Sequence, residues 1–289
     1  FWKDAIGRLM KNKVAVVCFF IIVLLILSCI VVPFFSPFES REQHLGEVNK
    51  GFMTVCTDSR YEGQHHVHYF GTDNLGRDLF LRAFEGGRVS LMIAFAAVFV
   101  NLIVGLIYGG ISGYIGGAVD TIMMRIVEIV NGIPYLIVVI LLMMVLPKGI
   151  FTMVVAYGIT GWTGMARLVR GQVLQLKSQE YIVAAEAMGA KSSRIIAKHL
   201  IPNALSVIII NVTLAIPSAI FTEAFLSYIG LGVPVPQPSW GVLAKGGQDV
   251  FMTYPYQLVV PAVAISLTML SFNLLGDGLR DAFDPRLRR

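Results

Sequence analysis

Residues 14–32 read VAVVCFFIIVLLILSCIVV, a run of 19 residues without Asp, Glu, Lys or Arg. Five further charge-free runs, of 18 to 27 residues, follow along the chain: 89–112, 129–147, 149–166, 200–222 and 250–276. An α-helix that crosses a bilayer needs about 20 apolar residues. Each of these runs therefore predicts one membrane-spanning helix.

The composition agrees with this interpretation. Of the 289 residues, 56% are hydrophobic and 14% are charged, whereas a soluble domain carries roughly 25% charged residues. This excludes a soluble enzyme, a nucleic-acid-binding protein and a disordered chain. We predict an all-α, polytopic membrane protein with six transmembrane helices.

The basic residues predict which parts of the chain face the cytoplasm, where positive charge is retained. With both termini inside, 15 of the 23 Lys and Arg residues are cytoplasmic, while the loop 33–88 has six basic and eight acidic residues. We therefore expect a multi-pass protein of the cell membrane. Its predicted parts are a cytoplasmic flank 1–13, a first helix 14–32, an extracytoplasmic loop 33–88, a five-helix core 89–279 with a cytoplasmic segment 171–204, and a cytoplasmic tail 280–289.

The first apolar run is too long for a signal peptide and lacks a small-residue cleavage site, so we expect it to remain as an anchor. Cys18 and Cys29 lie inside this helix, and Cys56 lies in the following loop. These residues predict no intrachain disulfide framework.

One acidic residue lies deep in a predicted span. Glu223 has no basic residue near it in the sequence, and charged groups in membranes usually face a bundle interior or a wet cavity. Two interpretations stay open: a polar position on a translocation path, or a protonated carboxyl group bonded to a neighbouring helix. The same path can be lined by three amides that interhelical hydrogen bonding explains equally well: Asn131, Asn211 and Asn273.

Small residues and prolines predict how the spans pack and bend. Four glycines recur at intervals of four and share one helix face, which favours close helix packing: Gly105, Gly109, Gly113 and Gly117. Three prolines lie within spans, and each is expected to bend its helix because it removes a backbone hydrogen bond: Pro134, Pro217 and Pro261.

Motifs of catalysis are missing from the sequence. There is no phosphate-binding loop, no zinc-binding H-E-x-x-H and no G-x-S-x-G nucleophile turn. All five histidines fall outside the predicted spans, and His65, His66 and His68 form a cluster that we interpret as solvated, without assigning a metal ligand. We expect a non-enzyme, whose energy for any uphill transport comes from a gradient or from another subunit.

The predicted cytoplasmic segment 167–203 contains two short helices. Residues 180–187 read EYIVAAEA, Gly189 ends the run, and 192–200 read SSRIIAKHL before Pro202. Ile195, Ile196 and Leu200 form an apolar stripe at helical spacing. A docking element explains this pattern, and an amphipathic segment on the lipid headgroups explains it as well.

This segment resembles the EAA motif of the membrane subunits of ABC importers, which reads E-A-A, three residues, G, nine residues, I-x-L-P. Ala184, Ala185, Gly189 and Pro202 match in register, whereas Val183, His199 and Ile201 depart from it. Two further stretches are similar to motifs of the dipeptide, oligopeptide and nickel permeases. They are GTDNLGRD at 71–78, and EAFLSYIGLG at 223–232 followed by QPSWG at 237–241.

The resemblance, which runs over nearly the whole chain, implies a type I ABC importer fold and an ATP-driven importer of peptides, with oligopeptides favoured by the long loop 35–70. It implies a homologous second permease subunit, two cytoplasmic ATPase subunits, an extracytoplasmic solute-binding protein and no nucleic-acid partner. It also implies that this chain binds no cofactor, because ATP and Mg belong to the partner subunits.

The resemblance also assigns residues. The coupling helix that sits in a groove of an ATPase subunit would include Ala184, Ala185, Glu186, Gly189 and Pro202. The family motifs outside the membrane correspond to Gly71, Thr72, Asp73, Gly76, Arg77, Asp78, Ser239, Trp240 and Gly241. The loop 233–257 is rich in Pro and aromatic residues, and we expect it to lack regular structure and to face the binding protein or plug the outer gate.

Two alternatives remain. The same motifs occur in dipeptide and nickel permeases, so the substrate is open within the family. An ion-coupled secondary transporter is the alternative from another class, but such transporters often show inverted repeats, and neither half of this sequence repeats the other.

Overall fold

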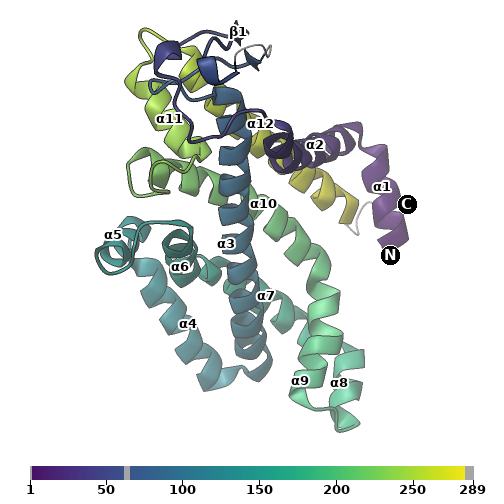
Figure 1. Ribbon diagram of the computed structural model, residues 1–289. Coiled ribbons are helices and arrows are strands. Elements are labelled where there is room, and N and C mark those ends of the chain that lie inside the picture. Colours follow the sequence, from purple (N-terminus) through teal and green to yellow (C-terminus); the bar gives the residue numbers. More distant parts are fainter. Residues whose placement is uncertain (1, 62–65, 284–289) are drawn as a thin grey trace.

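The longest helix, α3 (Leu79–Ile115), runs through the middle of the computed structural model, which describes residues 2–61 and 66–283 (Figure 1). Helices α2, α6, α7 and α10 pack against it. The helices are α1 (Trp2–Lys11), α2 (Lys13–Phe35), α3, α4 (Gly117–Gly132), α5 (Tyr135–Val145), α6 (Ile150–Thr160), α7 (Trp162–Lys177), α8 (Glu180–Ala187), α9 (Ser192–Ile195), the π-helix η3 (Ile196–Leu200), α10 (Ile201–Tyr228), α11 (Trp240–Asp249) and α12 (Tyr256–Phe283).

Four continuous helical stretches of the described residues are long and apolar enough to cross a membrane: Lys13–Phe35, Leu79–Ile115, Ile196–Tyr228 and Tyr256–Phe283. A fifth candidate is the pair α4 and α5, bent by 79°. The predicted span 149–166 is instead divided between α6, of 11 residues, and the start of α7. The described chain thus has four continuous spans and one bent one where the sequence predicts six continuous helices.

The bend between α4 and α5 lies at Pro134, as the sequence predicts. Ile133 is extended, with φ −87° and ψ 119°, because a residue before proline is pushed out of the helical region. Pro217 and Pro261, by contrast, lie inside the continuous helices α10 and α12. A membrane helix tolerates proline where its neighbours satisfy the freed carbonyl group.

Helix α3 begins ten residues before the predicted span, at Leu79 rather than 89, so the loop expected over 33–88 ends at residue 78. Asp78 caps the helix, and its Oδ1 accepts a hydrogen bond from the Leu81 N–H at 2.7 Å. Residues 79–88 include charged side chains, so the apolar run does not extend over them. A helix that continues beyond the membrane can carry such charges.

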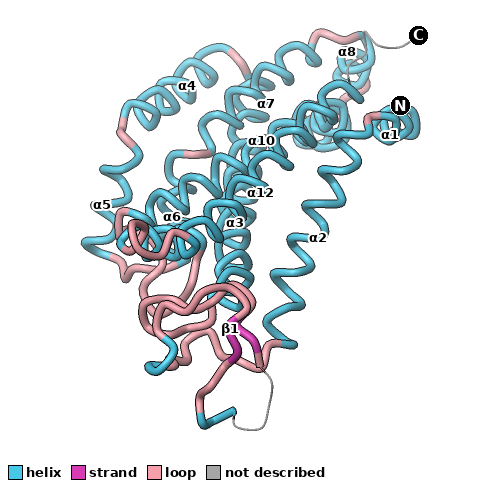
Figure 2. Tube along the Cα trace, turned by 90° about the horizontal axis from the view of Figure 1, so that it is seen from above, coloured by secondary structure: helices cyan, strands magenta, loops and turns pink. Residues whose placement is uncertain are grey.

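The two ends of the bundle differ. Residues 36–61 and 66–78 cover one end, which we call the loop end, and α1 and α8 lie at the opposite end, the α8 end (Figure 2). The loop end holds the short 3₁₀ helices η1 (Leu45–Glu47) and η2 (Ser59–Tyr61) and a two-stranded antiparallel ribbon of β1 (Thr54–Val55) and β2 (Val67–His68). Residues 62–65, which include His65, lie outside the described residues.

The predicted glycine stripe is a packing face. A Cβ on Gly105, Gly109 or Gly113 of α3 would collide with Met165, Ala166 or Arg170 of α7. Gly117 has no such neighbour, because it begins α4. Close approach of the two backbones explains the small residues.

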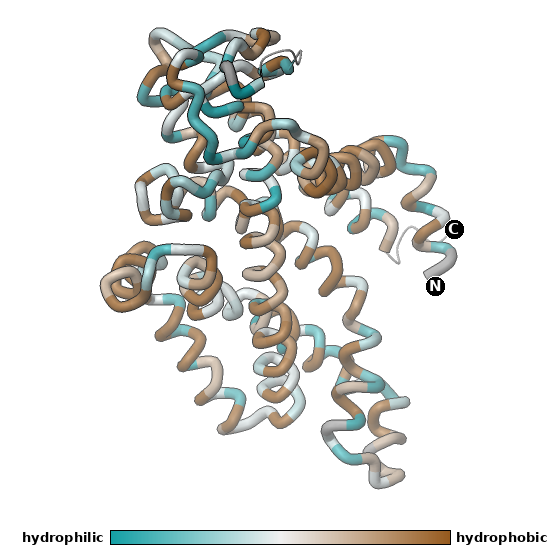
Figure 3. Tube along the Cα trace, viewed as in Figure 1, coloured by the Kyte–Doolittle hydropathy of each residue, from teal (hydrophilic) through white to brown (hydrophobic). Residues whose placement is uncertain are grey.

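Apolar side chains also cover much of the outer surface. Phe20, Phe99 and Val263, from three different helices, are each more than half exposed. Figure 3 shows hydrophobic residues along the middle of the helices and hydrophilic ones at the loop end and around α8. This arrangement suits helices that are surrounded by lipid or by other membrane helices.

Candidate functional site

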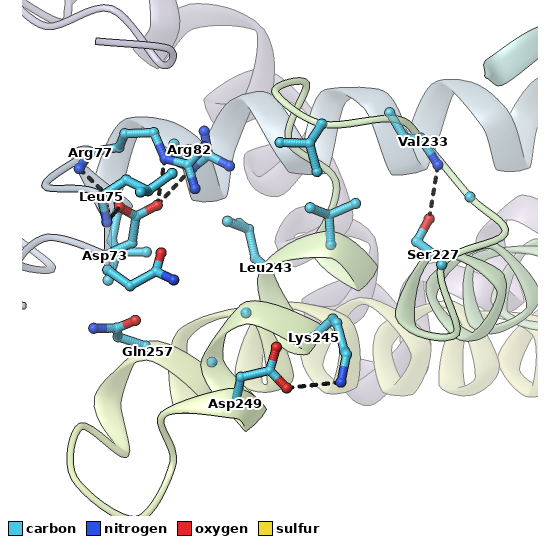
Figure 4. A pocket seen from close by; sticks show the side chains of 18 of the residues that line it. Asp73, Leu75, Arg77, Arg82, Ser227, Val233, Leu243, Lys245, Asp249 and Gln257 are labelled. Atoms are coloured by element: carbon cyan, nitrogen blue, oxygen red, sulfur yellow. Dashed lines mark hydrogen bonds and ion pairs between the residues drawn. The ribbon is translucent and has the colours of Figure 1, made fainter. Parts of the chain in front are cut away.

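A cavity of about 500 Å³ opens at the loop end (Figure 4). It lies between the segment 73–82, the turn after α10, the helix α11 and Gln257 at the start of α12. Four cationic and two acidic side chains line it: Arg77, Arg82, Lys148, Lys245, Asp73 and Asp249. The excess of positive charge favours an anionic group in this cavity.

Asp73 holds the cationic wall together. Arg77 Nε donates to Asp73 Oδ2 at 2.7 Å, and Arg82 Nε lies 3.6 Å from the same oxygen. The Arg82 side chain, 1% exposed, also donates to the carbonyl of Ser40 at 2.8 Å. One carboxylate thus faces two guanidinium groups, and the wall keeps a net positive charge.

The motif GTDNLGRD forms the turn that carries this wall. Gly71 and Gly76 have φ of 75° and 72°, and a Cβ on either would overlap the backbone carbonyl of Lys50 or His44. Asp73 Oδ1 accepts hydrogen bonds from two backbone N–H groups further along the turn, those of Leu75 at 2.9 Å and Arg77 at 3.0 Å. The motif therefore fixes the loop against the start of α3.

The last residues of the turn enter a buried network. Asp78 Oδ2 lies 2.7 Å from Nδ1 of His68, whose Nε2 lies 3.0 Å from Glu47 Oε2. Burial lowers the pKa of His68, but hydrogen bonds and charge attraction from Asp78 and Glu47 outweigh it, so the pKa lies above its ordinary value. Thr72 donates to the carbonyl of Glu47 and closes the network. His68 is therefore a buried structural residue bonded to two carboxylates, not a solvated member of a histidine cluster.

The second outer motif, QPSWG at 237–241, holds α11 against α3. Ser239 caps α11, and the buried Trp240 donates from Nε1 to the carbonyl of Ala83 at 2.9 Å. A Cβ on Gly241 would collide with the backbone of Ala224. The loop 233–257, expected to be irregular, thus contains the helix α11, because the serine supplies an N-cap that the proline-rich flank hid.

Glu223 of α10 is buried beside this contact between α11 and α3, with an exposed fraction of 1%. Its Oε1 accepts a hydrogen bond from Ser227 at 2.8 Å, and the hydroxyl groups of Ser90 and Ser239 lie near the carboxyl group. The serine hydroxyls accept backbone N–H groups, Ser90 from Trp240 at 3.1 Å and Ser239 from Val242 at 3.2 Å, so their own protons are free to point at Glu223. Ser227 lies one turn further along α10 itself, and the other carboxyl oxygen, Oε2, is buried without a hydrogen-bond partner among the described residues. Both interpretations of Glu223 therefore stay open.

At the α8 end, the short helix α8 packs on the last turns of α7. Ile182 of α8 is fully buried in a cluster with Val169 and Val173 of α7. Val183 and Met188 point outward, 54% and 81% exposed. Helix α8 therefore buries one side and leaves an apolar side uncovered.

The predicted coupling residues lie on and beside this helix. Ala185 is buried, whereas Ala184 and Pro202 are exposed. Gly189, with φ of 80°, ends α8. The side chain of Glu186 lies outside the described residues.

The comparisons with known proteins agree with this geometry. Residues 101–289 match the family model "Binding-protein-dependent transport system inner membrane component". The chain belongs to this family. Residues 1–51 match the model "N-terminal TM domain of oligopeptide transport permease C".

Similar proteins cover nearly the full length of this permease. It is 50% identical to the oligopeptide transport system permease protein OppC of Bacillus subtilis, over 100% of this chain and 90% of that protein. It is 48% identical to the dipeptide transport system permease protein DppC of the same organism, over 99% of this chain and 86% of that protein. The OppC of Escherichia coli strain K12 is 44% identical, over 99% and 92% of the two chains.

Solved structures share the fold. The inward-facing MetNI methionine ABC transporter matches with a TM-score of 0.56 at 20% identity, over 71% of this chain and 97% of that chain. This permease has the type I ABC importer transmembrane fold, as the sequence predicts.

The amides suggested for the path do not gather at the cavity of this permease. Asn131 of α4 is paired with the Thr163 hydroxyl of α7 at 2.7 Å. Asn211 of α10 is half-buried and Asn273 of α12 is exposed. None of the three, nor Glu223, lines the loop-end cavity.

Sequence reasoning missed the contacts that hold α7, the helix that carries α8. Arg170 makes two hydrogen bonds of 2.6 Å to the carboxylate of Asp120 on α4, and Lys177 donates to the carbonyl of Tyr114 at 2.6 Å. The charge of Arg170 was visible in the sequence, but its partner lies 50 residues away. A bidentate pair of this kind fixes orientation as well as distance.

Proposed function

We propose that the chain is the transmembrane permease subunit of an ATP-driven importer of oligopeptides. The apolar, uncovered side of α8 carries this proposal. It gives a rigid element, packed on α7, on which a cytoplasmic ATPase subunit can press and so turn the helices between access states.

The proposed assembly contains a homologous second permease subunit, two ATPase subunits and an extracytoplasmic binding protein that delivers the peptide. The α8 end and both termini of the chain face the cytoplasm in this proposal, and the loop end faces the binding protein. ATP and Mg bind to the ATPase subunits, so transport needs no cofactor on this chain.

The loop-end cavity has a place in this function. The excess of positive charge among the residues that line it suits the carboxylate end of a peptide as the binding protein releases it. Backbone and terminal groups are common to all peptides, so such a cavity is compatible with many side chains.

Two methionine variants test the proposal. Met188, directly after α8, is 81% exposed, and Met252 at the loop end is 96% exposed. Met188→Asp adds a charge to the apolar side of α8, and we expect the ATPase subunits no longer to co-purify with the chain. Met252→Asp makes the same change at the opposite end and should leave the ATPase subunits bound. Co-purification of the ATPase subunits with both variants would contradict the docking role of α8.

The substrate is tested in proteoliposomes that contain the whole complex and its binding protein. We expect uptake of labelled tetra- and pentapeptides to be driven by ATP, and the isolated chain to hydrolyse none. Transport confined to dipeptides would instead favour the activity named for the second relative, while the role of α8 would stand.

A further inference from the structure

Three potential metal ligands meet in the loop at the loop end, away from the cavity described above. His44 precedes η1, Glu47 ends it, and Cys56 follows β1. One donor atom from each residue lies within 4.8 Å of the others. All three are buried, with exposures of 1%, 2% and 7%. The fold thus gathers an imidazole nitrogen, a carboxylate oxygen and a thiol sulfur away from solvent.

This donor set identifies the class of ion. An imidazole nitrogen, a thiolate sulfur and a carboxylate oxygen are all ligands that Zn²⁺ takes in proteins, and a water molecule would complete its four-coordinate shell here. Calcium and magnesium prefer oxygen donors throughout. A borderline-soft divalent ion therefore fits this site better than an alkaline-earth ion.

Neighbouring residues orient the donors. His44 Nδ1 lies 2.9 Å from Asp58 Oδ2, the arrangement in which a metal-binding histidine gives its second nitrogen to a carboxylate. His44 Nε2 is buried and has no hydrogen-bond partner among the described residues. Glu47 Oε1 accepts from the Thr57 hydroxyl at 2.9 Å. The imidazole and the carboxylate are thus held before any ion arrives.

The site is joined to the rest of the protein by the 71–78 turn. The His44 N–H donates to the carbonyl of Gly76 at 3.3 Å, and Glu47 reaches α3 through His68 and Asp78. An ion at His44, Glu47 and Cys56 would cross-link η1 to the segment after β1. It would thereby stiffen the loop that covers the start of α3.

We propose that His44, Glu47 and Cys56 bind one Zn²⁺ ion that stabilises the loop end. Coordination forms a bond from the Cys56 sulfur to the ion and releases the thiol proton to solvent. This proposal does not rest on the proposed function, since the residues of the site are not those that line the cavity.

The test uses the assembled complex without a histidine tag, stripped with a chelator and dialysed against Zn²⁺. We expect bound zinc to fall by one ion per chain in Cys56→Ser. The matched control is Cys29→Ser, another buried free thiol, which should keep the ion. Asp58→Asn removes only the support of His44 and should weaken binding about 10- to 100-fold.

A second measurement needs no variant. X-ray absorption of the zinc-loaded wild-type complex should show one sulfur at about 2.3 Å from the ion. Zinc content unchanged in Cys56→Ser, or a wild-type spectrum with no sulfur neighbour, would overturn the proposal. If Cys56→Ser fails to assemble, the sulfur neighbour in the wild-type spectrum decides alone.

Discussion

Two glycines of the loop end differ in how strongly the surrounding structure requires glycine. Gly76 has φ of 72°, and a Cβ there would overlap the His44 carbonyl, whereas a Cβ on Gly46 would meet nothing within 4 Å. The left-handed region alone costs a non-glycine residue about 1–2 kcal/mol. We expect Gly76→Ala to destabilise the chain by more than about 2 kcal/mol because the overlap adds to this strain, and Gly46→Ala to be nearly neutral. Denaturant unfolding of the loop, followed by the exposure of Cys56, measures both. Equal midpoints would contradict the turn described here.

The buried environment of Glu223 determines how its replacement affects stability. Removal of a buried hydrogen-bonding partner costs about 1–3 kcal/mol. Glu223→Ala should therefore destabilise the assembled complex by about that amount, because serine hydroxyls lose their acceptor. Glu223→Gln keeps a carbonyl for them and should cost less than half as much. Thermal unfolding and peptide uptake are measured together. A Gln variant with normal stability and no uptake would instead place the carboxylate on the translocation path.

At the scale of single elements, the end of α8 depends on backbone geometry. The Ala190 N–H donates to the Ala185 carbonyl at 3.1 Å across Gly189, the bond that closes a helix on a left-handed residue. Asparagine tolerates this conformation better than other residues that carry a Cβ.

On the proposed function, Gly189→Gln should therefore uncouple the complex, and peptide-stimulated ATP hydrolysis and uptake should each fall at least fivefold. Gly189→Asn should keep most of both rates. Normal rates in Gly189→Gln would show that this segment does not couple, and equal losses in both variants would assign the effect to side-chain bulk.

The elements also show how far the sequence could lead. The apolar runs predicted α2, α3, α10 and α12, because lipid demands long apolar helices. They missed the start of α3, where Asp78 supplies a cap among charged residues. They also missed the division of 149–166 at Gly161, since a glycine in an apolar run signals packing and interruption equally well.

The sites were less accessible to sequence reasoning than the helices. The motif 71–78 pointed to the correct turn, but its partners His44, Glu47 and His68 are joined to it only by folding. Arg82 lies in a segment that the sequence predicts to be a loop. In the structure it is a buried residue at the cavity, held by its hydrogen bond to the carbonyl of Ser40. Long-range pairs of this kind leave no periodic signal in one sequence.

At the scale of the whole molecule, the proposed topology makes a prediction about sidedness. Five passages lie between α1 and the loop-end residues that follow α10: α2, α3, the pair α4 and α5, the pair α6 and α7, and α10. Lys148, between the two pairs, donates to the Gly230 carbonyl after α10 and so lies towards the loop end. The pair α4 and α5 therefore runs towards the loop end, and the pair α6 and α7 runs back. An odd number of crossings places α1 and the loop end on opposite sides of the membrane.

Two matched methionine replacements test this count. Met10 on α1 and Met252 at the loop end are 63% and 96% exposed, and the native Cys18, Cys29 and Cys56 are buried. A membrane-impermeant maleimide should label Met252→Cys on intact cells and Met10→Cys only in inside-out vesicles, with the wild-type chain as the control for background. If the pair α6 and α7 did not cross, the number of crossings would be even, and both cysteines would react from the same side. Labelling of both from one side would therefore replace the six-crossing topology with one in which a broken pair re-enters the membrane.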